Sequence, residues 1–147
     1  MADTTIYKTK VEPFVRGWLS ERFGVPFEPR EIFLSGAQPP QRQHGFDAVS
    51  LHGKIVAGIN ASSGKTSRGK HPAGKIHKAY QEVYFLSLIE AERKLLVLTD
   101  PDFFEIFSSE TRGHLATSVE IVLCPLPPEL KAEVDKVRTK ATSEVGG

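Results

Sequence analysis

The sequence predicts an α/β fold in which a mixed central sheet of about five strands is flanked by helices. Two long segments repeat apolar residues at helical spacing, and five short apolar runs bounded by turn residues indicate strands. Their order is helix, three strands, helix, strand, helix, strand, helix. With 147 residues and 39% hydrophobic content, the chain has the length and composition of one domain. We therefore expect a single domain over 1–147, with a core from about 11 to 124.

The first half of the chain predicts one helix and three strands. The helix begins at residue 11 or 12 and ends at Phe23, because an apolar stripe recurs there and Pro13 is tolerated only in a first turn. Residues 25–29 contain two prolines and are expected to be a connector. The strand candidates span 31–35, 46–51 and 54–61. The short His52–Gly53 turn makes the last two strands an antiparallel hairpin.

The second half begins with the longest predicted helix, from about 75 to 93. The apolar run 94–99 is typical of a central strand covered on both faces. A helix that leads into such a strand implies a right-handed crossover onto a parallel partner. The remaining elements are a short helix from 100 to about 107, a strand at 119–124 and a C-terminal helix at 129–144 with a frayed tail.

Composition narrows the class of protein. The single cysteine, Cys124, rules out a disulfide within the chain and a cysteine-based zinc site. The chain begins without a basic and apolar leader, and it lacks the run of about 18 apolar residues that spans a bilayer. We expect a cytoplasmic protein with no membrane partner. The net charge is only +1, so any affinity for a polyanion must come from local charge.

Local positive charge is concentrated in residues 62–78, called the basic segment here. It holds five Lys or Arg, two His and no acid, and glycines and hydroxyl residues separate the charges. Glycines let backbone amides approach an anion, and a helix N-terminus follows, which favours anions. The segment favours phosphate binding, with a solvated loop as the alternative. The predicted nucleic-acid-binding residues are Lys65, Arg68, Lys70, His71, Lys75 and Lys78.

Two other motifs are weaker. The stretch 58–66 approximates a P-loop, but five residues instead of four separate its glycines, and 67–72 does not continue as the required helix. A nucleotide triphosphatase is therefore not expected. The five histidines have no metal-ligand spacing.

The order of the elements, with Asp47 on the second strand, resembles the PD-(D/E)XK nuclease superfamily, the restriction-endonuclease-like fold, over about 11–100. In that family an Asp near the start of the second strand binds a divalent metal. An acid and a lysine two residues apart on the third strand complete the site, and they act on the scissile phosphate and the attacking water. Asp47 matches the first acid. The expected acid falls on Gly58 and the expected lysine on Asn60, so the motif is degenerate.

Residues on the helices are the candidates to replace the missing groups. No Asp or Glu lies between Asp47 and Glu82, which makes Glu82 the best substitute acid. Glu12 or Glu21 on the first helix is a further candidate. If the site is active, the resemblance implies Mg²⁺ as the cofactor, held by Asp47 and Glu82. The predicted catalytic residues are then Asp47, Glu82, Lys75 and Lys78. The alternatives are a turn or strand-edge residue hydrogen-bonded to nearby backbone for Asp47 and a solvated helix face for Glu82.

The sequence therefore predicts a nuclease-like nucleic-acid-binding protein with a degenerate, possibly inactive site, and DNA is the favoured nucleic acid. Three alternatives stay open. They are a non-catalytic protein-interaction or self-association module, a metal-dependent endonuclease with migrated catalytic residues, and an enzyme acting on a small phosphorylated ligand. A homodimer is expected by analogy with related nucleases, which often span a duplex as two copies.

Overall fold

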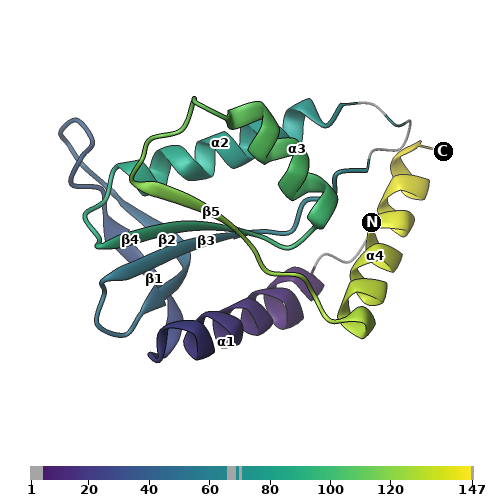
Figure 1. Ribbon diagram of the computed structural model, residues 1–147, viewed down its shortest axis with the longest axis horizontal. Coiled ribbons are helices and arrows are strands. Elements are labelled where there is room, and N and C mark those ends of the chain that lie inside the picture. The colour runs from purple at the N-terminus through teal and green to yellow at the C-terminus, as the bar shows by residue number, and fades with distance from the viewer. Residues whose placement is uncertain (1–4, 66–68, 70, 147) are drawn as a thin grey trace.

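A computed structural model describes residues 5–65, 69 and 71–146, with side chains described up to Thr139. It confirms the α/β class, with a five-stranded mixed sheet and helices on both of its faces (Figure 1). The elements in chain order are η1 (Tyr7–Val11), α1 (Glu12–Phe23), β1 (Phe27–Phe33), β2 (Gln43–Ser50), β3 (Ile55–Asn60), α2 (Ala73–Ser87), β4 (Arg93–Leu98), α3 (Pro101–Thr111), β5 (Val119–Leu123) and α4 (Pro128–Gly146).

The strands lie side by side in chain order, β1-β2-β3-β4-β5. The first three form an antiparallel meander, whereas β3, β4 and β5 are parallel. The predicted hairpin of β2 and β3 and the predicted crossover through α2 are both confirmed. The parallel part of the sheet brings the carboxyl ends of β3 and β4 to one edge, which is where ligand sites form in α/β sheets.

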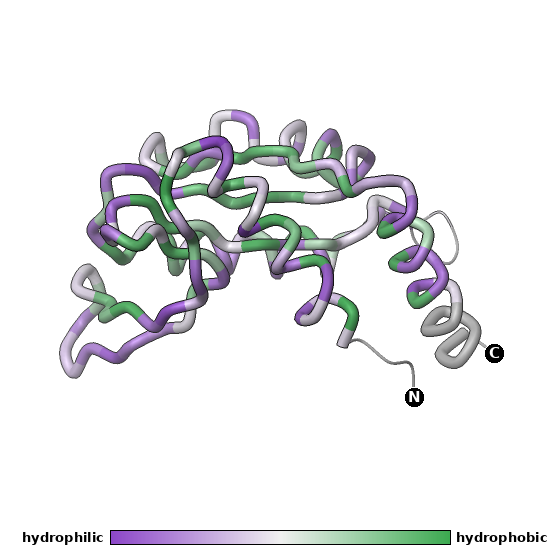
Figure 2. Tube along the Cα trace, turned by 90° about the horizontal axis from the view of Figure 1, so that it is seen from below, coloured by the Kyte–Doolittle hydropathy of each residue, from purple (hydrophilic) through white to green (hydrophobic). Residues whose placement is uncertain are grey.

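The core has two layers, one on each face of the sheet. Leu96 and Leu98 of β4 pack under α2 and α3, whereas Leu95 and Val97 pack under α1 and α4. The strand is thus covered on both faces, as its apolar run predicts. The central strands are largely hydrophobic along their length (Figure 2). The core also extends past the expected limit at 124, because Val134 of α4 is fully buried.

Strand β1 begins earlier than predicted. It spans Phe27–Phe33 rather than 31–35, so it includes the last three residues of the segment 25–29 that was expected to be a connector. Pro26 lies in the connector as expected, whereas Pro29 lies within the strand. Because β1 is an edge strand, a residue without an N–H is tolerated there, and Pro29 was a misleading signal.

Helix α2 ends at Ser87, six residues before the predicted end at 93. The apolar stripe continues past the helix because Ile89 is buried in the turn that follows. The Gly36 N–H, from the loop between β1 and β2, donates to the carbonyl of Leu88 at 2.7 Å and covers the helix end. Two other helical features escape the sequence prediction: η1 was missed, and α3 extends to Thr111 instead of 107.

No helix in the described part of the chain is both long and apolar enough to cross a membrane.

Candidate functional site

Asp47 lies at an irregular point of β2. The pairing with β1 shifts register there, so that Asp47 and Ala48 together lie opposite Pro29 alone. Such a bulge redirects side chains and often lies beside functional sites. The Asp47 carboxylate accepts a hydrogen bond from the Ile59 N–H of β3 at 2.9 Å, and Arg16 of α1 donates to the Asp47 carbonyl at 3.0 Å. Asp47 is thus fixed by its neighbouring strand and by α1.

Glu82 extends from α2 into the space that the glycine at position 58 leaves open. A Cβ built on Gly58 would lie 3.6 Å from Leu96 Cδ1 and 4.0 Å from Glu82 Oε2. The side-chain position of residue 58 therefore points toward α2. A longer side chain there would compete with the Glu82 carboxylate for the same space. The acid that the nuclease resemblance places on the third strand has a counterpart here on α2.

The Glu82 carboxylate is bound to Asn60, the residue at the expected lysine position. Asn60 Nδ2 donates to Glu82 Oε1 at 2.5 Å, and Asn60 Oδ1 accepts from the Ser62 N–H at 2.8 Å. Burial and, to a smaller extent, the negative charge of Asp47 raise the pKa of Glu82 to about 7, against the lowering effects of the Asn60 hydrogen bond and of Lys78. Asp47 and Glu82 are thus close enough to repel each other electrostatically, and these two residues are called the acid pair here.

A third carboxylate, that of Glu12, lies near Asp47. Glu12 begins α1 directly after the π-helical turn η1, and its N–H donates to the carbonyl of Tyr7. Burial raises the pKa of Glu12, and so does the charge of Asp47. Lys8 and Arg16 partly compensate the charge of Glu12, because their nitrogens lie 3.5 and 3.8 Å from Glu12 Oε1. Glu12 thus fits its predicted role as an alternative acid better than Glu21, which is exposed on the same helix.

Among the residues that the structure describes, no group of three or more His, Cys, Asp or Glu is placed to hold a metal ion. A metal at this site would therefore have Asp47 and Glu82 as its protein carboxylates and would need other oxygen ligands. Mg²⁺ is commonly bound in this way, through one or two carboxylates with water and substrate phosphate.

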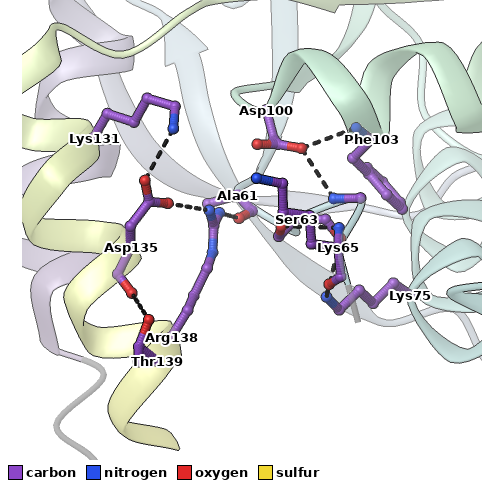
Figure 3. Close-up of polar contacts among 11 residues, drawn as sticks. Ala61, Ser63, Lys65, Lys75, Asp100, Phe103, Lys131, Asp135, Arg138 and Thr139 are labelled. Atoms are coloured by element: carbon purple, nitrogen blue, oxygen red, sulfur yellow. Dashed lines mark hydrogen bonds and ion pairs between the residues drawn. The ribbon is translucent and has the colours of Figure 1, made fainter. Parts of the chain in front are cut away.

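Residues 61–65, which lead into and begin the basic segment, are tied to α4, to the N-cap of α3 and to α2 (Figure 3). Arg138 of α4 donates to the carbonyl of Ala61. The Gly64 N–H donates to the Asp100 carboxylate at 2.9 Å, and the same oxygen caps α3 through the Phe103 N–H at 2.9 Å. These tethers make 61–65 an integral part of the fold.

Gly64 packs too closely against α3 to carry a side chain. A Cβ there would lie 2.7 Å from Asp102 Cβ and 2.8 Å from the Phe103 nitrogen. The glycine is therefore required for the close approach of the segment to the helix.

Lys75 and Lys78, both predicted phosphate contacts, have different environments. Lys75 Nζ donates to the carbonyls of Ser63 and Lys65, at 2.9 and 3.1 Å, and burial lowers its pKa. Lys78 is exposed one turn before Glu82, and its ammonium forms no hydrogen bond or ion pair with the described residues. Lys75 stabilises the segment, whereas Lys78 is available to a ligand.

The other predicted nucleic-acid-binding residues do not lie together in the structure. His71 Nε2 lies 2.6 Å from the Glu110 carboxylate of α3, away from the acid pair. Lys65 is exposed at the end of the tethered part. Arg68 and Lys70 lie outside the described residues.

A cleft of about 1140 Å³ opens beside Glu82. Its walls come from η1 and the start of α1, the end of β3 with 61–65, α2, the start of α3, and α4. Five candidate residues from the sequence line it, namely Glu12, Lys65, Lys75, Lys78 and Glu82, whereas Asp47 is not among the lining residues. The sequence prediction missed Asp100 and Arg138, which also line it, because their role depends on how α3 and α4 pack against the segment. No sequence motif marks Arg138, and the Asp-Pro pattern marks Asp100 only as the N-cap of the short helix, which the structure confirms.

Comparison of the chain with protein-family models, with curated proteins and with solved structures finds no match. The resemblance to the PD-(D/E)XK nucleases thus stays a prediction that rests on the order of the elements and on Asp47.

Proposed function

We propose that the protein is a divalent-metal-dependent nuclease that binds nucleic acid in the cleft, with its second acid and its cation supplied by α2 instead of β3. One observation carries the proposal. The Glu82 carboxylate extends toward the space above Gly58 and lies near enough to Asp47 for the charge of Asp47 to raise its pKa. Two carboxylates this close, one of which lines the cleft, are costly without a cation and become favourable with one.

The donor set fits Mg²⁺. Asp47 and Glu82 would hold the ion, which prefers carboxylate oxygens supplemented by water and phosphate. When bound, Mg²⁺ supplies Lewis-acid polarisation of the phosphate and lowers the pKa of a bound water. The hydrogen bond from Asn60 fixes the Glu82 carboxylate in position before any ion binds.

The cations of the cleft differ in their availability to a phosphate. Asp135 accepts from Lys131 at 2.9 Å and from Arg138 at 3.2 Å, and Lys75 is bound to backbone carbonyls. Lys65 and Lys78 remain for the substrate. Lys78 has the better position, because the spacing of four residues places it on the same face of α2 as Glu82.

The experiment is a cleavage assay on labelled DNA and RNA with Mg²⁺, Mn²⁺ or EDTA. We expect metal-dependent cleavage that falls to background in Asp47→Asn and in Glu82→Gln, which remove a charge and keep the shape. Glu90→Gln serves as the control, because Glu90 is exposed in the turn after α2. Full activity in either site variant would contradict the proposal.

Binding without cleavage is the second candidate function. It is favoured by Asn60, which replaces the expected lysine and already occupies one oxygen of Glu82. This candidate predicts affinity that falls steeply with salt, because phosphate contacts release counterions, and no strand scission with any metal. The same assay, run beside a binding titration, separates the two candidates.

A further inference from the structure

Helix α4 forms one wall of the cleft and is tied to two of the other walls. Arg138 donates to the carbonyl of Ala61, just after the end of β3 (Figure 3). Lys10 of η1 lies 2.6 Å from the Glu133 carboxylate of α4. Between these two contacts, Val134 is fully buried in the core. The cleft is therefore enclosed on the side of α4 by a helix that packs against the rest of the fold.

The cleft lining combines charged with apolar side chains. The apolar ones come from η1, β3, the residue after β3, α3 and α4, and they are Tyr7, Val11, Ile59, Ala61, Pro101 and Val137. The outside of a duplex presents mainly sugar and phosphate, for which cations and hydrogen-bond donors suffice. A cleft that holds apolar side chains together with cations suits a nucleotide whose base is unpaired, because such a nucleotide has an apolar base face and a charged phosphate.

Tyr7 is the one aromatic residue among the described residues that line the cleft. Its side chain is partly buried and packs against the core layer under α1 and α4, and its hydroxyl forms no hydrogen bond with the described residues. Its carbonyl accepts from the Glu12 N–H across the π-helical turn, a kind of turn that is frequent at functional sites. Tyr7 thus lines the same cleft as Glu12, Glu82 and Lys78, with its ring supported by the core.

We propose that the cleft takes single-stranded nucleic acid and that an unpaired base of the strand stacks on Tyr7. The inference rests on the proposed function and names its substrate class. Bases in a duplex stack on one another and hide their faces, whereas an unpaired base can stack on an aromatic side chain. The cleft volume of about 1140 Å³ is slightly above the ~300–1,000 Å³ of small-molecule sites, so it has room for a few nucleotides of one strand and not for both strands of a duplex. Ordering the Tyr7 ring costs little entropy, because it already packs on the core.

The test is a binding titration in EDTA at about 50 mM salt, so that affinity is measured without cleavage. Four ligands are compared: a single strand, the same strand with abasic positions, a duplex of the same length, and a mononucleotide. The proteins are wild type, Tyr7→Leu and Tyr84→Leu. Leucine at position 7 keeps an apolar side chain on the core and removes the flat ring. Tyr84 is the matched control, because it is 59% exposed on α2 and does not line the cleft.

We expect wild type to prefer the single strand to the duplex, although the duplex carries the higher charge density, and to bind the mononucleotide more weakly than the strand. Tyr7→Leu should weaken binding to the single strand by about fivefold to 100-fold, the range for loss of one stacked base. Abasic positions should weaken binding to wild type and have little effect on Tyr7→Leu. Tyr84→Leu should bind like wild type. The abasic comparison in wild type needs no substitution, so it tests stacking even if leucine at position 7 disturbs the fold.

A preference for the duplex, or wild-type affinity that abasic positions do not change, would overturn the inference and leave the proposed function standing. Equal affinity of wild type for the mononucleotide and for the strand would assign the cleft to a small phosphorylated ligand and also overturn it. Failure of wild type to bind any nucleic acid would overturn the proposed function as well.

Discussion

The start of the basic segment and Glu82 of the acid pair line the same cleft, but the electrostatics of the segment and of the pair differ. At the segment, the amide of Gly64, the carbonyls of Ser63 and Lys65 and the ammonium of Lys75 all have partners. At the acid pair, burial of Glu82 and, to a smaller extent, the charge of Asp47 raise the pKa of Glu82 to about 7, and neither carboxylate forms an ion pair with the described residues. Satisfied polar groups stabilise a fold, whereas unbalanced charge in a cleft indicates a ligand. The acid pair is therefore the stronger sign of chemistry.

The largest expected effect on stability comes from Asp100. Replacing Asp100 with Ala removes the cap of α3 and leaves the Gly64 N–H without its acceptor, and the side chain is buried. We expect a loss of about 2–4 kcal/mol in the free energy of unfolding, from one lost cap and one unsatisfied donor. Urea denaturation measures it. Asp102→Ala is the control, and an equal loss in that variant would show that the effect is only that of helix charge.

Glu82→Gln should increase the free energy of unfolding instead of lowering it. The folded-state pKa of about 7 exceeds the ordinary value of 4.5, so the folded state binds more protons between these values and loses stability as pH rises. Because Gln does not ionise, the Glu82→Gln variant does not lose this stability as the pH rises. It should be more stable than wild type by about 1–3 kcal/mol above pH 7, since one pKa unit corresponds to about 1.4 kcal/mol and the side chain is partly exposed. The gain should vanish below about pH 4.5. Denaturation at several pH values tests this, and a gain that does not depend on pH would refute the raised pKa of Glu82.

The smallest effects separate the two lysines. Lys75→Met should lower the free energy of unfolding by about 1 kcal/mol, because two carbonyls lose their donor. Lys78→Met should leave stability unchanged and reduce the salt dependence of nucleic-acid binding by about one phosphate contact, a slope change of about 0.7–0.9. Both are measured by denaturation and by salt titration of binding. Interchanged results for the two variants would contradict the division of roles.

The sequence predicted the order and pairing of the elements, because apolar periodicity and turn residues are local signals. It also singled out Glu82 as a candidate acid, since the chain between Asp47 and Glu82 holds no other acid. It did not separate Lys75 from Lys78. Both precede Glu82 on one helix, and only the path of 61–65 decides that Lys75 reaches carbonyls.

Long-range packing explains the remaining differences. Arg138 contacts Ala61 across 77 positions of the chain, and no local pattern encodes that contact. The β1 boundary was missed for a related reason: whether Pro29 ends a strand depends on whether the strand lies at the sheet edge.

Calorimetric titration with Mg²⁺ and Mn²⁺ at pH 7, in two buffers of different ionisation enthalpy, tests the central claim most directly. The account predicts one binding site that is lost in both Asp47→Asn and Glu82→Gln. Binding to wild type should release a fraction of a proton, because Glu82 is partly protonated near pH 7 until a cation binds. No binding to wild type, or binding that neither substitution weakens, would contradict the account.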